Sequence, residues 1–158
     1  MPIAITLHML SAVVWVGGMF FAYMALRPAA ASLLEPPQRL PLWSKTFERF
    51  FPWVWTAVVI LPASGYWMIF EVFEGMRNAG LYIHVMQAIG IVMIMIFLHL
   101  YFAPYQRMNK AIAAGDWPAA AKQLAVIRRL VGTNLILGLI TVAVASGGAY
   151  WLNVTRVF

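Results

Sequence analysis

The sequence predicts an all-α integral membrane protein, a four-helix bundle forming a single transmembrane domain over residues 1–158. Of its 158 residues, 63% are hydrophobic and only 10% are charged, whereas about a quarter of the residues of soluble domains are charged. Four apolar runs reach the roughly 20 residues that a helix needs to cross about 30 Å of hydrocarbon. Lipid is therefore the solvent expected around most of the chain.

Prolines and charged residues separate the four predicted helices. The spans are expected over residues 3–26, 51–70, 81–103 and 130–152. The first is predicted to end at Arg27-Pro28 and the third at Pro104, because a proline disfavours the helical conformation in the residue before it. Pro62 is expected as a kink inside the second span, since neighbouring helices can cover the carbonyl that it frees. Residues 41–50, with several aromatic side chains, are expected to form an interfacial helix.

Lys and Arg residues are concentrated in two of the connectors between the predicted spans. Four lie between the first and second spans and five between the third and fourth, against one in the loop over residues 71–80 and one in the C-terminal tail. Cytoplasmic loops carry the excess of Lys and Arg, so both termini are predicted outside. We expect a multi-pass protein of the bacterial inner membrane. The net charge of +6 belongs to these connectors, so the bilayer is the expected partner and nucleic acid is not.

All three histidines fall inside predicted spans, where an ionisable side chain is costly and is therefore a functional candidate. His8 and His84 are expected at similar depth near the outer side. His99 lies on the same predicted helix as His84, about 22 Å deeper in the membrane. Two imidazoles at one depth can hold a haem iron, and imidazole is also a good copper ligand. His8, His84 and His99 are therefore the candidate metal ligands, although His99 could instead hydrogen-bond to Asn134 as interhelical packing.

Other side chains extend this candidate site. Trp15 and Gly18 follow His8 along one face of the first helix at helical spacing. Gly18, beside Gly17, offers close approach to either a flat cofactor or another helix. Gln87 lies one turn from His84 and is a candidate to orient a ligand or a quinone. The chain has ten methionines, which suit Cu(I) but also serve as apolar filler, and no cysteine.

Three stretches of the chain resemble known membrane families. Residues 8–21, HMLSAVVWVGGMFF, resemble the first helix of the copper resistance protein D (CopD) family and are similar to the first helix of HemJ-type protoporphyrinogen oxidases. Residues 82–86, YIHVM, resemble the HemJ segment WLHIK, and residues 108–115 resemble the basic stretch that follows it. The resemblance covers the first and third predicted helices.

This resemblance implies a helical bundle that handles haem b or copper, with His8 and His84 at the histidine positions of the family. Met86 stands where the HemJ pattern has a lysine important for activity, which argues against protoporphyrinogen oxidation. The first hypothesis is therefore a CopD-like inner-membrane protein that binds haem b through His8 and His84 and serves electron transfer, with a redox partner or quinone.

Three alternatives stay open at this point. They are copper binding or transport in copper homeostasis, a HemJ-type protoporphyrinogen IX oxidase, and a structural subunit of a membrane complex. Whether the protein is an enzyme is left open, with a haem-dependent oxidoreductase as the enzymatic case. A homodimer is also considered, because four short helices form a narrow wall around a large cofactor.

Overall fold

The computed structural model describes residues 2–151, and the side chains as far as Gly148. Its regular structure within these residues is helical throughout, as predicted. The elements are α1 (Pro2–Phe21), a π-helical turn (Ala22–Leu26), α2 (Arg27–Leu33), α3 (Pro36–Phe73), a 3-10 turn (Met76–Asn78), α4 (Leu81–Leu100), a second π-helical turn (Tyr101–Tyr105), α5 (Gln106–Ala113) and α6 (Trp117–Trp151). Four continuous helical segments are long and apolar enough to cross a membrane. The prediction of a four-span, all-α fold is confirmed.

Two helices continue past the prolines at which their ends were predicted. The first segment runs through Pro28 to Leu33, and the third runs through Pro104 to Ala113. A π-helical turn precedes Pro28 and another contains Pro104. A proline lacks the N–H of the helical ladder and its ring crowds the carbonyl four residues back, and the wider π turn gives that carbonyl room. The two predicted ends are therefore interior bends of longer helices.

The second segment is also longer than predicted. Residues 41–50, expected as a separate interfacial helix, form the first part of the continuous 38-residue helix α3. A helix of this length extends about 57 Å, well beyond a hydrocarbon core of about 30 Å. α3 accommodates Pro41, Pro52 and Pro62 in its interior and ends where Glu74 adopts a left-handed conformation. Its first part thus projects from the predicted span into the region of the basic connectors.

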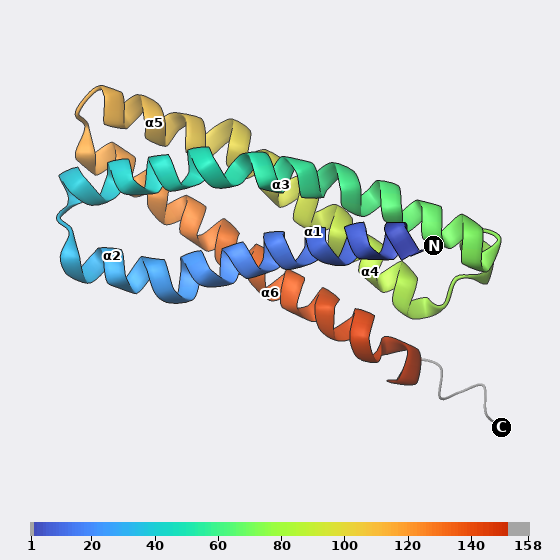
Figure 1. Ribbon diagram of the computed structural model, residues 1–158. Coiled ribbons are helices and arrows are strands. Elements are labelled where there is room, and N and C mark those ends of the chain that lie inside the picture. The colour runs from blue at the N-terminus through green and yellow to red at the C-terminus, as the bar shows by residue number, and fades with distance from the viewer. Residues whose placement is uncertain (1, 152–158) are drawn as a thin grey trace.

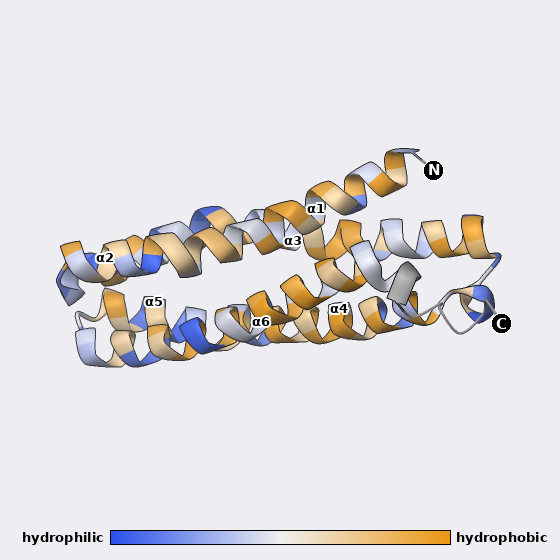
Figure 2. Ribbon diagram, turned by 90° about the horizontal axis from the view of Figure 1, so that it is seen from below, coloured by the Kyte–Doolittle hydropathy of each residue, from blue (hydrophilic) through white to orange (hydrophobic). Residues whose placement is uncertain are grey.

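The helices pack as two layers, which Figure 2 shows from the side. α1 packs along α3 in one layer, α4 packs along α6 in the other, and α6 also touches α1 and α3. Pro2, the loop over residues 74–80 and the last turns of α6 lie at one end of the bundle, called here the loop end (Figure 1). The two connectors rich in Lys and Arg, residues 27–49 and 104–129, lie at the opposite or basic end. This arrangement agrees with the predicted order of crossings, while the side of the membrane on which each end lies stays a prediction.

Aromatic rings form the core between the layers. The rings of Phe47 and Phe51 stack with centroids 5.2 Å apart, and Tyr105 meets Phe51 edge-on at 4.9 Å. Trp15 of α1 meets Phe97 of α4 edge-on at 6.2 Å. This core lies in the middle of the bundle and toward its basic end, whereas a smaller cluster around Ile69, Ala79 and Ile83 closes the loop end. Many large apolar side chains remain exposed along the helices, as a surface that faces lipid requires.

Candidate functional site

His8 lies on α1 and its ring faces α3. The Nδ1 atom of His8 is 2.9 Å from the hydroxyl oxygen of Ser64, a side chain that is only 5% exposed. The ring also lies against the backbone at Gly65, where an added Cβ would be 3.3 Å from the His8 Cε1 atom. The adjacent residues Ser64 and Gly65 on α3 therefore form the surface against which this imidazole packs.

The hydrogen bonds of Ser64 determine which nitrogen of His8 carries the proton. A hydroxyl has one proton to donate, and Ser64 directs it to the carbonyl oxygen of Ile60 at 2.6 Å. The Ser64 oxygen therefore accepts from His8 Nδ1–H. A neutral imidazole protonated on Nδ1 has its free lone pair on Nε2. We assign this tautomer from the hydrogen-bond network, and it makes Nε2 the atom available to a metal ion.

This pairing is typical of a metal-binding histidine. Such a histidine donates its second ring N–H to a protein acceptor, which fixes both the tautomer and the orientation of the ring. His8 is predicted from the sequence as a candidate ligand, but its partner Ser64 is not. Its role depends on α1 lying against α3, a contact between residues 56 positions apart. A hydroxyl in the middle of a span was the one signal available from the sequence.

His84 and His99 both lie exposed on α4. His8 is turned toward α3 in one layer, whereas His84 is on the surface of a helix in the other layer, so the structure does not bring these two rings together in a closed pair. The alternative considered for His99, a hydrogen bond to Asn134, is not formed in the structure. The Asn134 amide instead donates to the carbonyl oxygen of Met93 at 3.2 Å, because His99 points outward while Asn134 is buried.

Gln87 gives independent information about the level of His84. Its side-chain amide donates to the hydroxyl of Tyr66 on α3 at 2.5 Å. Tyr66 is two residues from Ser64, so His8 and Gln87 both meet α3 within the same turn. His84 is one turn from Gln87 toward the loop end. The predicted similarity in depth of His8 and His84 is therefore consistent with the structure, although their pairing stays a prediction.

Trp15 and Gly18 lie in the packed core beyond His8. Trp15 is 3% exposed and contacts Phe97. At Gly18 an added Cβ would be 2.3 Å from the ring of Phe50, so that ring occupies the space beside this glycine. Gly17 has open space around it and is exposed. The close approach that Gly18 permits is used by an aromatic side chain of α3.

The donors around His8 are few and of one kind. Within residues 2–151 the structure holds no group of three or more His, Cys, Asp or Glu side chains placed to share a metal ion. The chain has no cysteine, so its soft donors are histidine and methionine. Met68 lies one turn from Ser64 on the same face of α3, and Met76 and Met86 pack on the small cluster at the loop end. Imidazole and thioether groups are therefore the soft donors on this half of the bundle, whereas the carboxylates of Glu71 and Glu74 lie exposed at the loop end.

Comparison with known proteins gives one match. The model of the family described as copper resistance protein D matches residues 44–147. The matched residues run from the first part of α3 into α6, and they include Ser64, His84 and His99 but not His8. No curated protein and no solved structure shows a significant match to the chain.

Proposed function

This chain belongs to the copper resistance protein D family, and from that premise we propose that it binds a copper ion inside the membrane through Nε2 of His8. The single observation that carries the proposal is the 2.9 Å contact between His8 Nδ1 and the Ser64 oxygen, whose own proton points to Ile60, so that the free lone pair is assigned to Nε2. Neutral imidazole is a good ligand for copper. The ion is the cargo or signal of a copper-resistance function and not a catalyst.

The methionines support copper over harder metal ions. Thioether sulfur selects Cu(I), whereas carboxylate and carbonyl oxygens suit Mg²⁺, Ca²⁺ and Mn²⁺. Met68 is half-buried on the Ser64 face of α3, and Met76 and Met86 lie between that level and the loop end. We infer that copper reaches His8 from the loop end, where these sulfur atoms gather. By the distribution of Lys and Arg this end faces the outside of the bacterial inner membrane.

Haem b is the second candidate, because the same Nε2 atom could serve as an axial ligand and His84 lies at a similar level. The space beside Gly18, which was considered for a flat cofactor, is taken by Phe50. His84, the second axial ligand of that hypothesis, is exposed on the other layer. These observations favour copper over haem.

One experiment separates the two candidates. The protein would be purified in detergent through a tag without histidine, and copper content, Cu(I) affinity by chelator competition and the reduced-minus-oxidised visible spectrum would be measured. We expect about one copper ion per chain, no b-type band, and loss of copper in His8→Ala. His99→Ala is the matched control, since it removes an exposed imidazole of the same helix bundle, and it should keep its copper.

Two results would contradict the proposal. Copper binding by His8→Ala equal to that of the wild type would remove His8 as the ligand. A b-type spectrum in the wild type that disappears in His8→Ala and in His84→Ala would transfer the site to haem.

A further inference from the structure

Three arginines at the basic end differ from every other described basic residue. Arg27, Arg39 and Arg128 are half-buried, whereas the remaining Lys and Arg residues within residues 2–151 are exposed. They come from the start of α2, the first turn of α3 and the first third of α6. Segments far apart in the sequence thus bring three guanidinium groups together where the two layers meet.

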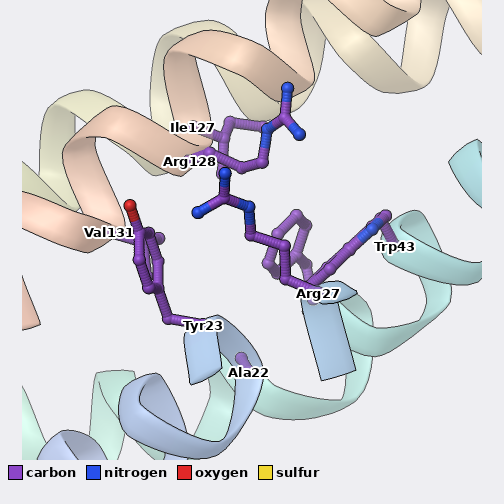
Figure 3. Close-up of a pocket in the computed structure, with 8 residues that line it drawn as sticks. Ala22, Tyr23, Arg27, Trp43, Ile127, Arg128 and Val131 are labelled. Carbon is purple, nitrogen blue, oxygen red and sulfur yellow. The ribbon is translucent and has the colours of Figure 1, made fainter. Parts of the chain in front are cut away.

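Two of these arginines line a pocket between α6 and the junction of α1 and α2. Figure 3 shows the Arg27 side chain rising toward α6, where Arg128 lies, with the ring of Tyr23 on one side and that of Trp43 on the other. The guanidinium carbon of Arg27 is 4.8 Å from the centroid of the Tyr23 ring. The rest of the lining is apolar and consists of Ala22, Phe47, Ile127 and Val131. We call this site the arginine pocket.

The positive charge of the arginine pocket has no counter-charge in the part of the chain that the structure describes. The only ion pair found there is Lys45–Glu48, and both its members are exposed. Partial burial, together with the neighbouring charges of Arg27 and Arg39, lowers the pKa of Arg128 from its ordinary value. Partial burial of like charges is costly unless an anion compensates them. An anion bound between these arginines would offset this cost.

We propose that the arginine pocket binds the phosphate group of an anionic phospholipid from the leaflet that surrounds the basic end. Guanidinium groups bind phosphate through paired, charge-assisted hydrogen bonds. Arg27 directly follows the first predicted span, residues 3–26, where lipid headgroups are expected. Basic pockets between transmembrane helices are known sites for such headgroups. The aromatic and aliphatic lining suits the glycerol and first methylene groups of a lipid better than it suits a hydrated inorganic ion.

The bound phosphate would join the two layers of the bundle. Arg27 belongs to the α1–α3 layer and Arg128 to the α4–α6 layer. A phosphate between them would replace repulsion across the interface by attraction on both sides. Lipid binding should therefore stabilise the fold by mass action. The inference is independent of the copper proposal, because none of these arginines lies at the His8 site.

The test measures thermal unfolding of the purified full-length protein in a neutral detergent, with phosphatidylglycerol, phosphatidylcholine or inorganic phosphate added. We expect phosphatidylglycerol to raise Tm by several degrees and phosphatidylcholine to leave it unchanged. Arg27→Gln and Arg128→Gln should each lower the affinity for phosphatidylglycerol, read from the concentration that gives half of the Tm shift, about tenfold or more. The loss of a charge-assisted hydrogen bond predicts this change. Arg129→Gln removes the same charge from the neighbouring exposed position and should keep the full response.

A readout without lipid separates binding from a merely structural role. Because Arg128 is repelled by its neighbours, Arg128→Gln should unfold in neutral detergent at a Tm equal to or above that of the wild type. A purely structural arginine would lower this Tm. If inorganic phosphate raises the Tm of the wild type as much as phosphatidylglycerol does, the pocket binds a soluble phosphate compound and the lipid proposal is overturned. Failure of phosphatidylglycerol to stabilise the wild type, or equal loss of its effect in Arg129→Gln, would overturn the site itself.

Discussion

Replacing Ser64 by alanine tests how the hydrogen bond behind His8 controls copper affinity. In the wild type the Ser64 oxygen, 2.9 Å from Nδ1, keeps the proton on that nitrogen and the lone pair on Nε2. Alanine removes the acceptor, so the ring can reorient and move its proton to the nitrogen that binds copper. Loss of such a partner typically lowers metal affinity about 10- to 100-fold, which corresponds to about 1.4–2.8 kcal/mol.

Chelator competition with Cu(I) measures this change directly, and thermal unfolding confirms that the variant is folded. Thr56→Ala is the matched control. Thr56 is another α3 hydroxyl that donates to a carbonyl one turn earlier, that of Pro52 at 2.9 Å, but it is exposed and away from His8. It should bind copper as the wild type does. If His8→Ala loses copper while Ser64→Ala keeps a Cu(I) affinity within about twofold of the wild type, the orienting role of Ser64 is refuted.

Two further predictions concern the packing of the layers. Gly18→Ala places a methyl group 2.3 Å from the Phe50 ring, so it should lower the free energy of unfolding by about 1–3 kcal/mol in detergent. Adding Phe50→Leu should restore the stability. An unchanged Tm in Gly18→Ala would show that the ring moves aside freely. The Tyr66–Gln87 hydrogen bond links α3 to α4, and a double-mutant cycle of Tyr66→Phe with Gln87→Ala should give a coupling energy of about 0.6 kcal/mol; additive effects of the two variants would argue that the contact is not formed in the membrane protein.

The sequence predicted the features that depend on composition and missed those that depend on contacts. Hydropathy identifies four spans because most residues of a transmembrane helix must be apolar, wherever its neighbours lie. The helix ends at Arg27 and Pro104 were misplaced because a π-helical turn can accommodate a proline, and hydropathy and proline positions do not reveal such a turn. His8 was found because a histidine within a span is rare and costly.

The partners of these polar groups could not be predicted, because depth along a helix does not give the direction in which a side chain points. Asn134 and His99 were assigned to each other on depth alone. In the structure one faces the core and the other faces outward. Ser64 was at hand as a partner for His8, yet only the packing of α1 on α3 brings the two together.

The distribution of packing suggests how copper binding and stability are divided along the bundle. The aromatic core holds the layers together from the middle of the bundle to its basic end, while a smaller cluster closes the loop end. His8 lies on the loop-end side of Trp15, two helical turns away. Regions with fewer buried contacts open at lower free energy, so the less packed half is where an ion can enter without unfolding the protein. Substitutions in the aromatic core should therefore change stability with little effect on copper binding. Substitutions near His8 should change copper binding with little effect on stability.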